Sequence, residues 1–169
     1  MGHRLIRALF GLALLIPAAC TVNYSLSGGS VPASAKTLSV TGFDARAPLC
    51  SPQAALHITE AVRDLMQAQT PLNLTGQDGD IAYEGAVIGY DVQPVAIQAN
   101  ETAALNRLTI TVNIRYTNKA DSKADTELTV SRFADYSSTQ DLSAVEDGLV
   151  QDIGKQLAQD IFDRTLGNW

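Results

Sequence analysis

The feature that most constrains the fold is an unbroken alternation of apolar and polar side chains from Leu108 to Thr117. A period of two over ten residues predicts a β-strand with one face on a core and the other in water, as in antiparallel sheets. The side expected to be buried holds Leu108, Ile110, Val112, Ile114 and Tyr116, and the side expected to be exposed holds Thr109, Thr111, Asn113, Arg115 and Thr117.

A second strand is expected immediately upstream, from Ile81 to Ile97, because this segment is rich in Val, Ile and Tyr. Gly85 and Gly89 weaken it, and Pro94 limits its pairing. The polar segment QANETAALN between the two strands predicts a turn. A long β-hairpin is therefore expected at the centre of the sheet.

An amphipathic helix is predicted between these strands and the N-terminal part of the chain. Ser51 and Pro52 form an N-cap and first-position pair, and the helix is expected along Gln53 to Gln69, ending before Pro71. Its apolar stripe at helical spacing is Ile58, Ala61, Val62, Leu65 and Met66.

A second, longer helix is predicted at the C-terminus. We expect it to begin at Ser143, with Glu146 completing a capping box, and to run to Leu166. Gly148 and Gly154 inside it either allow close packing on the sheet or on a partner, or are simply tolerated. Its apolar stripe is Val145, Leu149, Val150, Ile153, Leu157 and Ile161.

The remaining strands complete a two-layer α+β sandwich. They are expected at Lys36 to Phe43, at a short edge segment Leu72 to Thr75, and at Thr126 to Tyr136, which follows a turn from Asn118 to Asp125. The order β-α-β-β-β-α predicts a mainly antiparallel sheet of four or five strands, with both helices on one face. The other face is then left wet or free for a partner.

The first residues form a secretion signal rather than part of the fold. A basic start precedes an apolar run, and from Ala8 to Ala19 there are twelve residues, about 18 Å as a helix and too short to cross a bilayer. Small residues then precede Cys20, as in a lipobox, although Pro17 stands where an aliphatic residue is usual. We expect Cys20 to be lipidated; the alternative is an ordinary signal peptide cleaved nearby.

The expected organisation is a signal peptide at 1–19, a lipidated tether at 20–35 rich in Ser, Gly and Pro, and one domain at 36–169. Thr21 follows Cys20, so the aspartate that marks inner-membrane retention in enterobacteria is absent and an outer-membrane anchor is favoured. Removing 1–19 leaves ten basic and eighteen acidic residues and changes the net charge from −6 to −8. A nucleic-acid partner is not expected on such a surface.

The sequence offers little material for catalysis. Beyond the signal it holds one histidine, His57, and one cysteine besides Cys20, Cys50 in the segment PLCSP. Neither a triad nor a zinc site of usual composition is expected from these. Asp78 and Asp80 lie in a turn that needs no metal. We expect a protein that is not an enzyme and that has no catalytic residue, metal or cofactor.

Extended stretches of the mature chain carry a resemblance to a known family. They are YSLSGGSVP, TGFDARAPL, TEAVRDLMQAQTPL, EGAVIGYDVQPVAIQANETAALNRLTITVNIRYTNK, SRFADYSST and VEDGLVQDIGKQLAQDIFDRTLGNW. The chain resembles the lipopolysaccharide-assembly lipoproteins of the LptE family, in the form found in Bacteroidetes.

The resemblance implies a lipoprotein at the periplasmic side of the outer membrane. Such proteins plug and help assemble the β-barrel of the lipopolysaccharide translocon, and they contact lipopolysaccharide during its delivery to the cell surface. By position, Arg115, Lys119 and Lys123 are the candidate contacts for its phosphates; the alternative is that they are ordinary solvated charges near a turn.

Two other classes of function stay open at this point. One is a generic outer-membrane adapter, such as a secretin pilot or an envelope chaperone, which the fold also permits. The other is a hydrolase that uses Cys50 or an acidic pair.

Overall fold

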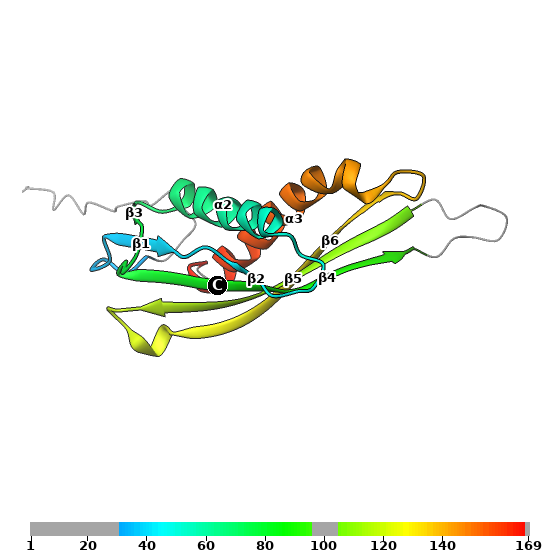
Figure 1. Cartoon of the computed structure of the whole chain (residues 1–169). Coiled ribbons are helices and arrows are strands. Elements are labelled where there is room, and N and C mark those ends of the chain that lie inside the picture. Colours follow the sequence, from blue (N-terminus) through cyan, green and yellow to red (C-terminus); the bar gives the residue numbers. More distant parts are fainter. Residues whose placement is uncertain (1–30, 96–104, 168–169) are drawn as a thin grey trace, which may run out of the picture.

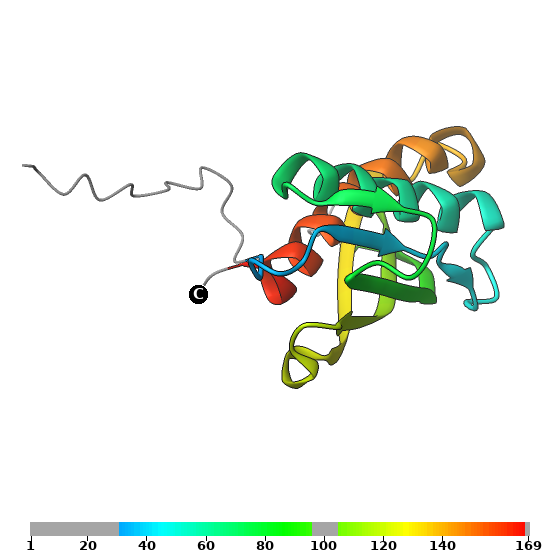
Figure 2. The same cartoon turned by 90° about the vertical axis from the view of Figure 1, so that its left-hand side faces the viewer.

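The structure, a computed structural model, describes residues 31–95 and 105–167. Two helices, α2 (Pro52–Gln69) and α3 (Leu142–Thr165), pack against each other on one side of a sheet, and none of the described helices covers the other side (Figures 1 and 2). The predicted two-layer α+β class is confirmed. No helix in these two ranges is both long and apolar enough to span a membrane.

The predicted hairpin forms the centre of the sheet. β4 (Ile81–Pro94) pairs antiparallel with β5 (Leu105–Asn118), with one bulge between Val87 and Gly89. The five apolar positions expected to face the core are at most 2% exposed, so the alternation assigned them correctly. Residues 96–104 of the expected turn and strand end lie outside the described ranges, whereas Leu105 and Asn106 belong to β5 and not to a turn.

The sheet is mixed and has six strands, which differs from the expected four or five. β1 (Thr37–Val40) runs parallel to both its neighbours, β3 (Asn73–Thr75) and β4. α2 carries the chain back to the starting end of the sheet, so the strands it connects run in the same direction. β2 (Asp44–Ala45), which lies beyond the predicted strand Lys36 to Phe43, runs parallel to β4 and pairs with it. β6 (Thr126–Ser137) pairs antiparallel with β5 and completes the order β3-β1-β4-β5-β6.

α2 begins and ends as predicted. The Ser51 hydroxyl accepts a hydrogen bond from the backbone N–H of Ala54 at 3.1 Å, and Pro52 occupies the first turn. Thr70 is already extended, because Pro71 disfavours the helical conformation of the residue before it. The Arg63 side chain donates to the carbonyl of Val40 at 2.8 Å, which fixes α2 against β1.

The predicted start of α3 is wrong. The helix begins at Leu142 after the N-cap residue Asp141, and Asp141 makes no side-chain capping bond. Ser143 lies inside the helix, and the Glu146 carboxylate accepts a hydrogen bond from the Tyr90 hydroxyl at 2.6 Å. The side chain expected to cap the helix instead joins α3 to β4.

The two glycines of α3 have different roles. A Cβ at Gly154 would lie 3.3 Å from the Cβ of Ala61, so Gly154 allows α3 to approach α2 closely. A Cβ at Gly148 would meet nothing within 4 Å, which means that this glycine is only tolerated. Close packing therefore explains one of the two positions, and the neighbour is the other helix and not the sheet.

Candidate functional site

The side of the sheet without helices, here called the open face, is built by the polar positions of the predicted alternation. Thr109, Thr111 and Asn113 are half-buried there and Arg115 is exposed. The strand register adds the residues of β4 and β6 that share this side. The open face comprises Glu84, Ala86, Thr109, Thr111, Asn113, Arg115, Glu127, Thr129, Ser131 and Phe133.

Hydroxyl and amide groups of neighbouring strands meet across the open face. The hydroxyls of Thr111 and Ser131 are 3.0 Å apart, and the Asn113 amide nitrogen is 3.4 Å from the Thr129 hydroxyl. These contacts leave donors and acceptors directed to solvent, because each hydroxyl can make more than one hydrogen bond. The open face is therefore a mainly polar surface, with Phe133 as its exposed apolar side chain.

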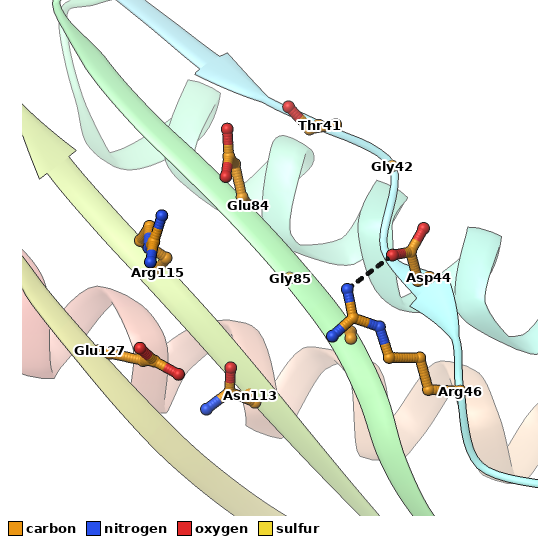
Figure 3. Close-up of a pocket in the computed structure, with 10 residues that line it drawn as sticks. Thr41, Gly42, Asp44, Arg46, Glu84, Gly85, Asn113, Arg115 and Glu127 are labelled. Atoms are coloured by element: carbon orange, nitrogen blue, oxygen red, sulfur yellow. Dashed lines mark hydrogen bonds and ion pairs between the residues drawn. The ribbon is translucent and has the colours of Figure 1, made fainter.

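A groove of about 380 Å³ lies on the open face, between β4, β5, β6 and residues 41–46 (Figure 3). Glu84, Arg115 and Glu127 project from three neighbouring strands at positions that are directly opposite one another in the register. Asp44 and Arg46 form an ion pair of 2.9 Å at the rim.

The charges of the groove decide which ligands it suits. Arg115, a predicted phosphate contact, is flanked by Glu84 and Glu127, so an isolated anion placed beside its guanidinium also meets two carboxylates. The groove instead offers mixed donors and acceptors to a hydrated or hydroxyl-rich group. The sequence analysis did not name Glu84 or Glu127, because their place beside Arg115 depends on the register of the three strands.

Lys119 and Lys123, the other predicted phosphate contacts, lie away from the groove in the turn between β5 and β6. The Lys119 ammonium donates to the carbonyl of Asp78 at 2.7 Å, which joins this turn to the turn before β4. Lys123 belongs to the short helix η1 (Ser122–Ala124) and its exposed ammonium has no hydrogen-bond partner in the described ranges. Of the three predicted residues, Lys123 has the ammonium that is most available to an anion.

The turn before β4 also receives the start of the domain. The Asp80 carboxylate accepts from the backbone N–H of Lys36 at 2.8 Å and from the N–H and hydroxyl of Thr37 at 3.0 and 2.9 Å. These donors, the Lys36 N–H most strongly, hold the pKa of Asp80 below its ordinary value. The Asp80 carboxylate thus has a structural role, because it accepts hydrogen bonds from the start of the domain. No group of three metal-binding side chains forms within 31–95 and 105–167.

Cys50 and His57 have settings that do not favour catalysis. The Cys50 thiol is buried, and burial, followed by the nearby Glu146 carboxylate, raises its pKa and disfavours the reactive thiolate. His57 is half-buried at the edge of a groove of about 480 Å³ between α2 and α3. Its ring is 3.2 Å from the amide nitrogen of Gln53 and 4.0 Å from the carboxylate of Asp147.

The remaining predicted site residue, Cys20, lies outside the described ranges, and its lipidation stays a prediction.

Comparison with known proteins identifies the family. The family model LptE, described as lipopolysaccharide-assembly, matches residues 35–165, which is well over half of the chain. The protein therefore belongs to the LptE family of lipopolysaccharide-assembly proteins, which is not a family of enzymes. No curated protein matches the chain.

Solved structures that are similar to this chain have low sequence identity. A protein of Xanthomonas campestris is 13% identical with a TM-score of 0.52, covering 80% of this chain and 91% of that chain. A minor lipoprotein of Acinetobacter baumannii is 18% identical with a TM-score of 0.48, covering 77% and 91%. Lipoprotein B of Nitrosomonas europaea is 14% identical with a TM-score of 0.49, covering 80% and 84%. At such identities the likeness concerns the fold alone.

Proposed function

We propose that this protein is the lipoprotein subunit of the outer-membrane lipopolysaccharide translocon. It plugs a large β-barrel partner, helps that barrel assemble, and contacts lipopolysaccharide on its way to the cell surface. Membership of the LptE family supports the assignment. The observation that carries it is the open face, a mainly polar sheet surface of three long strands that can line an aqueous lumen.

The anchor in this proposal is a lipid on Cys20, followed by a tether that enters the domain at Lys36. Asp80 holds the backbone of Lys36 and Thr37, so the tether meets a fixed point of the fold. The lipid would hold the protein at the membrane, and a second contact would strengthen the attachment and fix the position of the domain. The barrel would supply that contact at the periplasmic side of the outer membrane.

Lipopolysaccharide contact in this proposal involves Lys119 and Lys123 at its phosphates, because phosphates pair with cations. Arg115, which lies between Glu84 and Glu127, would contact a hydroxyl-rich part of the same molecule. The backbone N–H of Lys119 donates to the Asp80 carbonyl at 2.9 Å, and Lys123 belongs to the same turn as Lys119. The two lysines are therefore close to the point where the tether enters. A glycolipid held near the membrane anchor would meet this turn.

The test is a mild-detergent purification of the tagged full-length protein from its own outer membranes. The proposal expects one large β-barrel protein in about equal amount, with lipopolysaccharide in the same fraction. A different partner, as a secretin pilot or an envelope chaperone would have, or no partner at all, would refute it.

The glycolipid contact is tested separately with the double variant Lys119→Ala, Lys123→Ala. We expect it to retain the barrel and to lose lipopolysaccharide from the purified fraction. Lys155→Ala is the matched control, since Lys155 is exposed on α3, away from this turn. Equal lipopolysaccharide recovery from the double variant and the control would contradict the assigned contact.

A further inference from the structure

We propose that the outer edge of β6 is the docking site for an extended strand of the barrel partner, which adds to the sheet as a seventh strand. The inference rests on the proposed function and specifies how the partner is held. An unpaired strand edge presents a row of backbone N–H and C=O groups, and the chemistry that satisfies such a row is another extended backbone.

The hydrogen-bonding pattern shows which groups of β6 point outward. The Leu105 carbonyl accepts from the N–H of Val95, so odd-numbered residues of β5 direct their backbone groups to β4. Even-numbered residues of β5 then bond to β6, where the register pairs Val112 with Val130. The backbone groups that point away from the sheet belong to Glu127, Thr129, Ser131, Phe133 and Asp135.

These outward groups are largely unoccupied. Within 31–95 and 105–167, no backbone hydrogen bond reaches the N–H groups of these odd-numbered positions. The Thr129 carbonyl receives the Arg164 guanidinium at 3.5 Å, at the long limit of a hydrogen bond. The edge is thus open along most of its length.

The two edges of the sheet differ in their protection. β3, at the other edge, has three residues, and shortness is one way in which proteins blunt an edge. β6 has twelve residues, contains neither proline nor lysine, and pairs with β5 without a register shift. Its charges are partly engaged, since Arg132 bonds to Asp160 of α3 and Asp135 to Arg107 of β5. A long, regular and unprotected edge is the form that strand addition requires.

Charge argues against a second copy of this chain as the occupant. When the β6 strands of two copies pair antiparallel, the longest pairing forms if the two-fold axis that relates them passes through Ser131 or Arg132. The first register places Glu127 opposite Asp135 twice, and the second places Arg132 opposite itself, and like charges directly opposite are destabilising. The mature chain also carries a net charge of −8, after loss of two arginines from the −6 of the whole chain. A strand of a different protein avoids both costs.

The side chains beside the edge define the strand that fits. Phe133 is 47% exposed on the open face and stacks under the Arg107 guanidinium, which lies 3.7 Å from the ring centroid. Glu127 has no ion-pair partner among the described residues. The partner strand is therefore expected to place an apolar residue next to Phe133 and a basic residue next to Glu127.

Residue-resolved amide hydrogen exchange tests the inference on the full-length protein, alone and co-purified with its barrel. In the free protein the amides of Thr129, Ser131 and Phe133 should exchange fast, whereas those of Val130 and Arg132 should be slow. In the complex the odd-numbered amides should slow by about tenfold or more. Unchanged fast exchange at these amides in an intact complex would overturn the inference and leave the proposed function standing.

A pair of variants gives a second readout. Ser131→Pro removes one outward N–H and adds a ring at the edge, so barrel recovery should fall by about tenfold. Ser131→Ala keeps the amide and should therefore lose much less barrel recovery than Ser131→Pro. The melting temperature checks that Ser131→Pro folds, and equal recovery from a folded Ser131→Pro protein would refute the edge. A β6-paired homodimer would also overturn the inference, and failure to find any barrel would refute the proposed function with it.

Discussion

The two faces of one sheet differ in what they do for the molecule. On the covered face, the five apolar residues of β5 at alternate positions from Leu108 to Tyr116 are buried to 2% exposure or less. On the open face, the residues between them are threonine, asparagine and arginine, which are half-buried or exposed. Because the same strand supplies both sets, the difference arises from alternation alone. One face stabilises the fold, and the other is left free to change its contacts without loss of the core.

The largest expected effect comes from substituting neighbours that point to opposite faces. Ile110→Ala should lower the free energy of unfolding by about 2–5 kcal/mol, because Ile110 is fully buried. Thr111→Ala should change it by no more than about 0.5 kcal/mol, since its hydroxyl contact with Ser131 is exposed. Denaturant unfolding of both variants measures this difference, and equal losses would contradict the contrast between the faces.

A smaller loss is expected from Gly85→Ala on the covered face. A Cβ at Gly85 would lie 2.7 Å from the Phe43 ring, which packs over this position of β4. Since the ring would have to move inside a packed core, we expect a loss of about 1–3 kcal/mol. An unchanged midpoint in urea would mean that Phe43 is held less firmly than the structure indicates.

Gly148→Ala is the matched control for Gly85→Ala, because it adds the same methyl group where no atom is close. A Cβ there meets nothing within 4 Å, and alanine is a better helix former than glycine. The variant should therefore gain about 0.5–1 kcal/mol of stability, observed as a higher melting temperature. A lower melting temperature would mean that the added methyl group at position 148 disturbs a contact of α3, which would contradict the open space found there.

The smallest expected effect is a pH dependence at the end of the sheet, where neither face is involved. Because hydrogen bonds lower the folded-state pKa of Asp80, its stabilisation is present above its unfolded pKa. That contribution should be lost as the pH falls below the ordinary aspartate range and through the lowered value. Melting temperatures of wild type and Asp80→Asn should thus differ at neutral pH and converge in acid. A constant difference at all pH values would refute this role.

Local patterns predicted the parts of the fold that depend on neighbours in sequence. The alternation of β5 and the Ser51–Pro52 start of α2 were both correct. The parallel pairing of β1 with β3 was not predictable, because it depends on where α2 returns the chain. The start of α3 was misplaced because Glu146 satisfies a tertiary partner, Tyr90, and not the helix end.

The candidate site was predictable to a lesser extent. Arg115 was assigned to the open face by parity, but its two glutamate neighbours come from strands whose register the sequence does not specify. The turn with Lys119 and Lys123 was expected, whereas the bond from Lys119 to Asp78 needs the two turns to meet in space. The charges of one strand can be read from the sequence. The electrostatic environment that the charges of neighbouring strands create together depends on how the sheet is paired.

The most direct measurement places a large side chain on the open face. Asn113→Trp fills the groove there, and tryptophan is well tolerated in exposed strands. The tagged full-length variant should melt within a few degrees of the wild type, while recovery of the β-barrel and of lipopolysaccharide from outer membranes falls by about tenfold. Normal recovery of both by a folded variant would contradict the claim that the open face is the functional surface.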